Sequence, residues 1–305
     1  MEFPVNFRFS RPPLPAAGQG RIVLIIGVLL AAAALQACSA VKIAYGQATE
    51  LAYWQLDGYF DFNAAQRPKV RDELARIHLW HRQTQLPAYI KTLEKWQPLL
   101  THDMDEAQAC SIFDEIRSRL QAISDHATPV AGALVTTLET EQLEALKRKF
   151  SKLNVEYRDD FLDGKPAALI EKRLKKAVSR AEMLYGSLEH AQRDVLKERI
   201  TRSVFDARIS LAEHQRRQRD ALQSLSPLIA GQSTPNQAHL VIQGYFERVA
   251  NSPDLVYRRY QDNLTRDSCK TFAALHNSTT AAQRAHAVKT LQRYAQDFAI
   301  LAARR

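Results

Sequence analysis

The chain has few of the residues that interrupt helices. It contains 10 glycines and 12 prolines in 305 residues, and long segments contain neither. No stretch alternates apolar and polar residues in the way that a half-buried strand requires. Because glycine and proline are the strongest local breakers of regular structure, their scarcity favours an all-α fold.

The chain also lacks the local patterns of common catalytic and nucleotide-binding sites. There is no glycine-rich phosphate loop, no nucleophile elbow and no paired-carboxylate motif. We therefore expect no catalytic residues and no cofactor, and we interpret the protein as non-enzymatic. His78 and His81 lie three residues apart on a predicted helix, but spacing places no third ligand beside them. A zinc site needs three or four ligands, so we expect no metal.

The amino-terminal segment has the layout of a secretory signal. An uncharged run from Ile22 to Leu35 follows three arginines and ends shortly before Ala37 and Cys38. A membrane-spanning helix needs about 20 apolar residues, so this shorter run fits a cleaved signal peptide. We predict a signal peptide over residues 1–37, a tether over 38–47 and a helical domain over 48–305, which can divide into two subdomains near residue 164.

The residues Leu35-Gln36-Ala37-Cys38 resemble a bacterial lipobox. The resemblance implies that Cys38 becomes the acylated first residue of the mature chain, and Ser39 resembles the outer-membrane sorting choice of Gram-negative lipoproteins. Acyl chains hold a protein on a membrane because each buried methylene contributes about 0.8 kcal/mol. We expect a lipid-anchored protein on the periplasmic face of the bacterial outer membrane. The alternative is an uncleaved short anchor with Cys38 as an ordinary buried thiol.

Only two other cysteines are present, Cys110 and Cys269. In an oxidising compartment such a pair can form a disulfide, which would close a long loop and stabilise the fold by about 4 to 5 kcal/mol in the entropy model. The sequence does not show that the two thiols meet, so two isolated buried thiols remain the alternative.

Positive charge is concentrated in one part of the chain. The formal net charge is +9, and the stretch from Lys165 to Arg219 holds 14 Lys and Arg against 7 Asp and Glu. Clustered cations attract anionic partners, and a secreted protein meets little nucleic acid, so we expect a protein or anionic lipid partner and no nucleic acid. The alternative is a solvated helix face with ion pairs at helical spacing. The candidate contact residues are Lys172, Arg173, Lys175, Lys176, Arg216, Arg217 and Arg219.

Helical periodicity and breakers together predict an elongated multi-helix bundle of about eight or nine helices after the signal peptide. The expected breaks are at Pro87, Thr128-Pro129, Asp163-Gly164 with Pro166, Ser226-Pro227, Gly231 to Pro235, Ser252-Pro253 and Asn277 to Thr280. The stretch from Gln192 to Leu225 contains neither proline nor glycine, so we predict one long helix there. The aromatic residues of the segment from Tyr53 to Phe62 are assigned to a core beside the membrane tether, with a ligand pocket as the alternative: Tyr53, Trp54, Tyr59, Phe60 and Phe62.

A short pattern recurs along the chain, with glutamine as its last residue at positions 66, 142, 192 and 283. In Asn63-x-x-Gln66 and Thr280-x-x-Gln283 the spacing predicts capping boxes, in which the two side chains satisfy each other's free backbone N–H groups. The pattern is also similar to the Leu-Thr-x-x-Gln signature of small helical periplasmic chaperones, although only Thr280 matches its threonine.

One group of residues resembles an uncharacterised proteobacterial lipoprotein family, a domain of unknown function. These residues are Trp54, Asp57, Tyr59, Phe62 and Gln66, then Trp80-His81-Arg82 and Leu86-Pro87-x-Tyr89. The resemblance implies an all-helical periplasmic body with an acylated amino terminus, and it implies no reaction, cofactor or site residue.

We therefore expect a membrane-anchored envelope lipoprotein that acts as a non-enzymatic helical scaffold or adaptor. Its partner would be a protein or an anionic lipid. A tethered holdase or folding factor is the alternative, motivated by the chaperone-like pattern. A hydrolase of envelope polymers would need convergent acids, or a nucleophile with its base, and the sequence offers neither.

Overall fold

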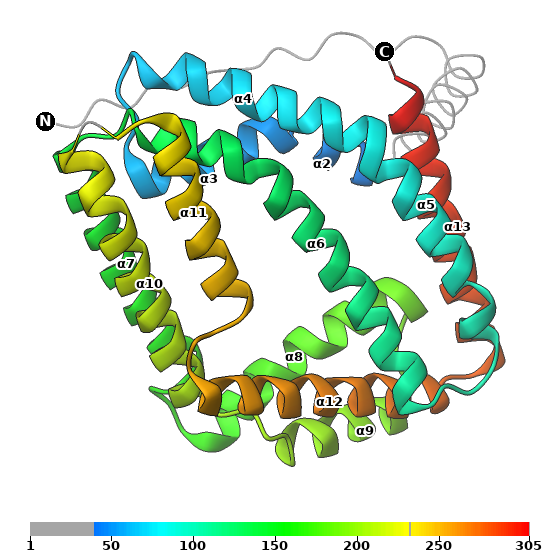
Figure 1. Ribbon diagram of the computed structural model, residues 1–305. Helices are drawn as coiled ribbons and strands as arrows, with labels where there is room; N and C mark the ends of the chain where they lie inside the picture. The colour runs from blue at the N-terminus through cyan, green and yellow to red at the C-terminus, as the bar shows by residue number, and fades with distance from the viewer. Residues whose placement is uncertain (1–39, 232, 305) are drawn as a thin grey trace, which may run out of the picture.

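The computed structural model describes residues 40–231 and 233–304, and all regular structure in these ranges is helical (Figure 1). The all-α class is confirmed. The predicted signal peptide, Cys38 and the start of the tether lie outside the described residues. The helices are α2 (Ala40–Gly46), α3 (Ala48–Phe60), α4 (Gln66–Trp80), α5 (Leu86–Trp96), α6 (Glu106–Val135), α7 (Thr140–Phe161), α8 (Pro166–Tyr185), α9 (His190–Thr201), α10 (Ala207–Ala230), α11 (Pro235–Ala250), α12 (Leu255–Asn277) and α13 (Ala281–Ala303).

The helices pack as a bundle whose members outline a frame (Figure 1). In that view α4 forms the upper side, α5 and α13 one flank, α12 with α8 and α9 the lower side, and α7 and α10 the other flank, while α6 crosses diagonally.

A π-helical turn, His81–Gln85, joins α4 to α5. Counting that run as one helix, the described residues form eleven helices, slightly more than expected. None of the helices in the described ranges combines the length and apolar content needed to cross a bilayer.

Two of the predicted breaks are wrong, because Pro129 and Pro227 lie inside α6 and α10. At Pro87 the π-helical turn gives way to α5, and the proline lies in the first turn of that helix, where a missing N–H costs little. Thr128 and Leu228, the neighbours of the first two prolines, are buried. Continuing each helix keeps these neighbours in the core, and that packing offsets the hydrogen bond that proline removes.

The single long helix predicted from Gln192 to Leu225 is also wrong, because α9 ends at Thr201 and α10 begins at Ala207. The Ser203 hydroxyl donates to the Asp267 carboxylate of α12 at 2.7 Å. Asp206 then caps the new helix by accepting from the backbone N–H groups of Arg208 and Ile209. Polar side chains therefore stop and restart the helix without glycine or proline.

The described residues form two hydrophobic cores. One contains Tyr53, Leu146 and Ile242, and the other contains Leu93 and Leu291. Each core draws on segments from both sides of residue 164, so a single boundary there does not separate them. Helix α6 contributes to both cores and joins one end of the frame to the other.

A disulfide links α6 to α12. The sulfur atoms of Cys110 and Cys269 lie 2.11 Å apart and the Cα atoms 5.1 Å apart, with 159 residues between them in sequence. Cys269 is fully buried in the core that contains Leu93. The bond therefore closes the lower corner of the frame across more than half of the chain.

Four buried glutamines pair the starts of helices that are distant in sequence. The side-chain amides of Gln66 and Gln142 each donate from Nε2 to the other's Oε1, at 2.9 and 2.8 Å. Gln192 and Gln283 form the same ring at 2.6 and 2.9 Å. Each Nε2 also donates to a backbone carbonyl in the partner's loop. Two equivalent amide rings therefore lie within the frame.

A capping box stands beside each of these glutamines. The boxes predicted at Asn63 and Thr280 are confirmed, because each side chain accepts from the glutamine N–H and each backbone N–H donates to the glutamine Oε1. Glu139 and Glu189 form two further boxes. Every glutamine oxygen thus accepts one bond from its own cap and one from its partner, which satisfies both lone pairs.

These contacts show that the frame is built from a repeated unit. Helix α3 packs on α4 and α7, and α8 packs on α9 and α13 in the same way. Before α4, the Phe62 N–H donates to the Asp57 carboxylate at 3.0 Å; before α9, the Leu188 N–H donates to Glu182 at 3.2 Å. The two units are interlocked, because α5 packs on α13 and α10 packs on α7.

Replacing Gln192 with leucine is expected to lower the free energy of unfolding by about 2 kcal/mol. The variant removes both bonds between Gln192 and Gln283, and it takes this partner from the Ser278 carbonyl and from the Glu189 N–H; a buried unsatisfied polar group costs about 1–3 kcal/mol. Urea unfolding measures the change. The double variant with Gln283→Leu should cost less than the sum of the single variants. A loss no larger than that of the exposed control Gln243→Leu would contradict this assignment.

Candidate functional site: a cationic pocket

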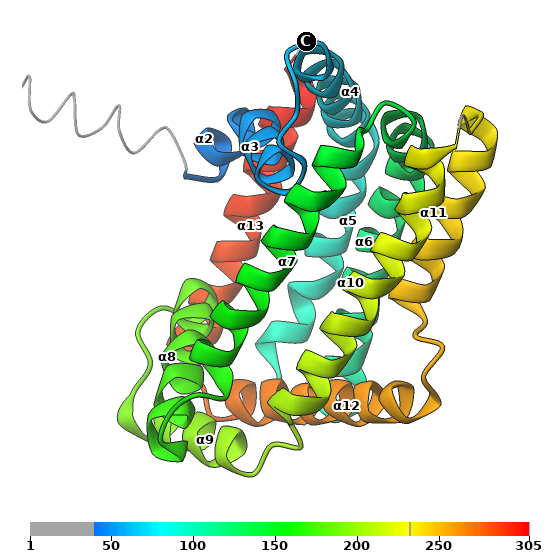
Figure 2. The same cartoon turned by 90° about the vertical axis from the view of Figure 1, so that its left-hand side faces the viewer.

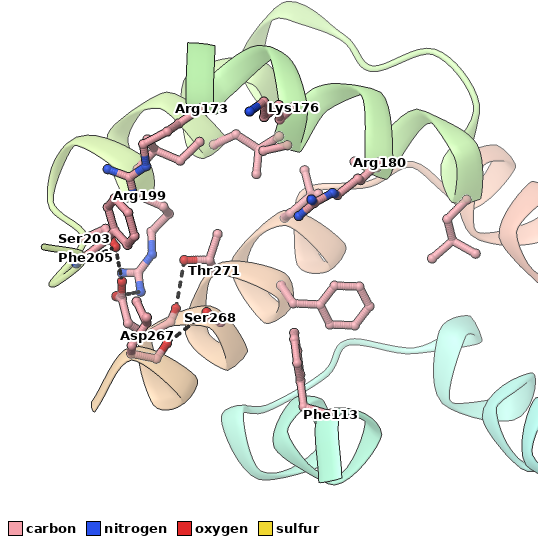
Figure 3. A pocket seen from close by; sticks show the side chains of 18 of the residues that line it. Phe113, Arg173, Lys176, Arg180, Arg199, Ser203, Phe205, Asp267, Ser268 and Thr271 are labelled. Atoms are coloured by element: carbon pink, nitrogen blue, oxygen red, sulfur yellow. Dashed lines mark hydrogen bonds and ion pairs between the residues drawn. The ribbon is translucent and has the colours of Figure 1, made fainter. Parts of the chain in front are cut away.

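A cavity of about 550 Å³ lies between α8, α9 and α12 (Figure 3). Its apolar lining includes Leu184, Leu196, Ile200, Leu264, Phe272 and Leu275. Phe113 reaches it from α6, and Phe161 and Phe205 come from the ends of neighbouring segments. The size and lining fall within the range of small-ligand sites, which are mostly apolar with a few placed polar groups.

Four cations also line this cavity. Arg173, Lys176 and Arg180 lie three and four residues apart on α8, so they share one face of the helix. Arg199 comes from α9 (Figure 3). The one acidic residue in the lining is Asp267. Its carboxylate accepts a hydrogen bond from the Ser203 hydroxyl at 2.7 Å and pairs with the Arg199 guanidinium at 3.5 Å. The pocket therefore carries an excess of positive charge.

The three cations on α8 have different surroundings. The Arg173 guanidinium lies 4.5 Å from the centre of the Phe205 ring, and burial lowers its pKa. Lys176 is paired with Asp160 at 3.1 Å. Arg180 is exposed and has no hydrogen bond or ion pair with any residue that the structure describes. Arg180 is thus the cation most available to a ligand.

Arg199 has an unused donor at the pocket. Its Nε atom is buried and has no hydrogen-bond partner among the described residues, although its terminal nitrogen lies 3.5 Å from Asp267. A buried donor without a partner costs about 1–3 kcal/mol.

The structure divides the seven candidate basic residues between two places. Arg173 and Lys176 line the pocket, and Lys172 lies beside them, paired with Asp160 at 3.9 Å. Lys175 is exposed on α8 outside the lining. The three arginines of α10 lie along another side of the frame (Figures 1 and 2).

On α10 two of these arginines are internal. Arg216 and Arg217 both bind the buried carboxylate of Glu213 at 2.8 Å, and Arg216 also pairs with Asp220 at 3.1 Å. Arg219 alone is exposed. The α10 arginines therefore serve mainly an ion-pair network and do not continue the pocket.

Sequence reasoning missed Arg180 and Arg199. The spacing of Arg173, Lys176 and Arg180 on a helix could have identified the first. Arg199 carries no such signal, because its position depends on how α9 packs beside α8 and α12.

The two histidines considered as metal ligands have other partners. The His81 ring nitrogens bond to the hydroxyl groups of Tyr45 at 3.0 Å and Tyr89 at 3.1 Å, and the His78 ring lies against Tyr45. Burial lowers the pKa of His81. Across the described ranges, no three His, Cys, Asp or Glu side chains come close enough to hold a metal ion. The pair instead helps to hold α2 on the body.

The aromatic segment from Tyr53 to Phe62 has two roles. Tyr53 and Phe62 are buried in the core as expected, and Tyr59, Phe60 and Phe62 line a second, uncharged cavity of about 350 Å³. The assignment of Trp54 to the core is wrong, because its side chain is 64% exposed. Helix α3 packs on α4 and α7 through its other faces, which leaves this tryptophan outside.

The described residues define the protein as an all-helical, strand-free body with a cationic pocket at one end. The chain belongs to a family of unknown function (DUF6279), whose profile matches residues 58–239. No curated protein and no solved structure matches the chain significantly.

Proposed function

We propose that the protein is a non-enzymatic helical adaptor of the bacterial envelope, which binds an anionic amphiphile in the cationic pocket. Acylated Cys38 would tether it to the periplasmic face of the outer membrane. The observation that carries the binding role is the combination of an apolar lining with four cations and one engaged acid. The lipobox resemblance at Leu35 to Cys38 supports the tether.

The ligand chemistry follows from this lining. A carboxylate or phosphate head would bind the guanidinium groups that line the pocket by charge-assisted hydrogen bonds. An attached acyl chain would cover the apolar lining. A fatty acid and a single-chain phospholipid share this chemistry, and both are smaller than a folded protein partner.

The hydroxyl groups of the pocket support a binding role over catalysis. Ser268 donates to the Leu264 carbonyl at 2.8 Å, and Thr271 donates to the Asp267 carbonyl at 2.8 Å. Ser203 donates to the Asp267 carboxylate, and no histidine lines the pocket. None of these hydroxyl groups has the base and orienting partner of an activated nucleophile.

Replacing Arg180 with glutamine is expected to weaken binding of a fluorescent fatty acid by about tenfold. A hydrogen bond to a charged group contributes about 1.5–3 kcal/mol, and 1.4 kcal/mol corresponds to a factor of ten in Kd. Fluorescence titration of the purified full chain gives the Kd. Displacement by lysophosphatidylglycerol compares a phosphate head with a carboxylate head at the same site.

Lys175→Gln is the matched control, since it removes one exposed charge from the same helix outside the pocket. Its Kd should change less than twofold. Equal losses in both variants would show that only the general positive field matters. Absence of binding, combined with suppression of aggregation of unfolded proteins, would instead favour the holdase alternative.

A further inference from the structure

The outer side of α2 and α3 is uncharged. The exposed positions between residues 43 and 58 are Ile43, Ala44, Gly46, Gln47, Leu51, Trp54, Gln55 and Gly58. A quarter of all residues in the chain are charged, so an exposed helical face of this length without a charge departs from the rest of the surface. We call these eight residues the α2–α3 face.

Three large apolar side chains stand on this face. Ile43 is 59% exposed, Leu51 is 51% exposed and Trp54 is 64% exposed. Leu51 and Trp54 lie three residues apart on α3, so they share one face of that helix, and Ile43 stands on the preceding helix α2. Exposed apolar residues that gather in this way mark an interaction surface more often than isolated ones do.

The charged residues of the two helices are occupied elsewhere. Lys42 pairs with Asp297 of α13 at 3.4 Å, and Glu50, at the edge of the face, pairs with Arg71 of α4. Asp57 accepts from the backbone N–H of Phe62. The helices are therefore fixed to the body through their polar groups, while their apolar side chains point outward.

The body holds this face rigidly. Tyr53, which precedes Trp54 on α3, is almost fully buried, and the Arg71 guanidinium lies 3.9 Å from the centre of its ring. The Tyr45 hydroxyl bonds to His81 at the π-helical turn. Little conformational order would have to be gained when the face binds a partner.

The position of the face in the chain identifies the partner. Helix α2 begins at Ala40, directly after the segment that contains the apolar run and Cys38. Ile43 is five residues from Cys38, and five residues span at most about 18 Å. Any membrane that holds Cys38 is thus within reach of the face. Figures 1 and 2 both place α2 and α3 at the end of the frame opposite to α8, α9 and α12.

We propose that the α2–α3 face lies in the interfacial region of the bilayer that holds Cys38. This inference rests on the tether in the proposed function. Interfacial helices bury their apolar face about 5–10 Å into the headgroup and acyl boundary, and tryptophan prefers that depth. Since the face is uncharged, its contact with lipid depends on apolar burial and is insensitive to salt, unlike ligand binding at the cationic pocket.

Fluorescence quenching tests the contact. The full chain is purified from membranes and reconstituted into phosphatidylethanolamine–phosphatidylglycerol vesicles whose acyl chains carry bromine, a short-range quencher. Roughly a third of the tryptophan emission should be quenched, because Trp54 is one of three tryptophans and Trp80 and Trp96 pack within the body. Quenching should disappear in Trp54→Phe and persist at high salt.

Leu51→Glu places a charge in the middle of the face and should reduce quenching by more than half while the acylated chain stays on the vesicles. Leu240→Glu is the control, because Leu240 is also an exposed leucine, at 66%, but lies on α11; it should leave quenching unchanged. An acylated, vesicle-bound chain with unquenched Trp54 would overturn the face proposal and leave the tether intact. Such a chain that instead forms dimers through Leu51 would overturn it as well.

Mass analysis of the same preparation separates the two claims. A chain without acyl mass would overturn the tether of the proposed function. The face would then be judged on that chain at high vesicle concentration. Quenching that rises with lipid would support the face proposal, and its absence would overturn it.

Discussion

Replacing Cys110 and Cys269 with alanine is expected to lower the free energy of unfolding by about 5 kcal/mol. The disulfide closes a loop of 159 residues, and in the chain-entropy model the stabilisation grows with the logarithm of loop length, reaching about 4.7 kcal/mol for a 100-residue loop. Urea unfolding at neutral pH measures the loss. A reducing agent should lower the unfolding midpoint of the unmodified protein to a similar extent.

The two single variants provide the control. Each one removes the whole bond, so Cys110→Ala, Cys269→Ala and the double variant should lose nearly the same stability. Their effects would therefore be strongly non-additive. An unfolding midpoint that is unaffected by reducing agent in the unmodified protein would contradict the structural role assigned to this bond.

Replacing Arg216 with methionine is expected to cost about 3 to 4 kcal/mol, the second-largest effect. The Glu213 side chain is only 2% exposed, and Arg216 connects it to Asp220, which Arg248 binds at 2.7 Å from α11. Removing one partner of a buried ion pair leaves a charge with incomplete compensation, which typically costs about 3–5 kcal/mol. Methionine keeps most of the packing volume, so the loss measures the charge.

Arg219→Met is the matched control on the same helix. Arg219 is exposed, and exposed substitutions usually change stability by less than about 0.5 kcal/mol. If both variants had the same small effect in urea unfolding, the network would be only a set of surface ion pairs.

The same network predicts how stability depends on pH. Burial disfavours the charged form of Glu213, but hydrogen bonds from Arg216 and Arg217 outweigh it, so its pKa lies below the ordinary value. A hydrogen bond from Arg248 is the main cause of the lowered pKa of Asp220. Carboxyl groups with lowered pKa stabilise the fold above their unfolded pKa of about 4 and lose that effect as pH falls below it. The deficit of Arg216→Met should therefore shrink below pH 4.

The helical class was predictable because it depends on local properties. Sparse glycine and proline, apolar residues at helical spacing and the boxes at Asn63 and Thr280 are all visible in the sequence. The continuation of α6 through Pro129 and of α10 through Pro227 could not be predicted from the sequence, since burial around each proline decides whether a helix continues. The break at Thr201 depended on Asp267, 66 residues away.

The candidate site was only partly predictable for the same reason. The excess of cations from Lys165 to Arg219 includes the α8 residues that line the pocket, yet it grouped Arg173 with Arg216, which binds a buried acid on another side of the frame. The recurring glutamines were recognised as caps, but their pairing across the molecule was not. Local spacing in the sequence shows which residues share a helix face. Which residues that face contacts is decided by tertiary packing.

The interlocking of the two repeated units also constrains the order in which the chain can fold. Helix α5 packs on α13, about 190 residues later in the sequence. As the polypeptide emerges from a ribosome or a translocation channel, α5 can contact α6 but lacks its main native neighbour until the last helix is made. Non-local contacts of this kind slow folding and expose surfaces prone to aggregation. The packing of α5 is therefore completed only after the carboxyl-terminal helix has been made.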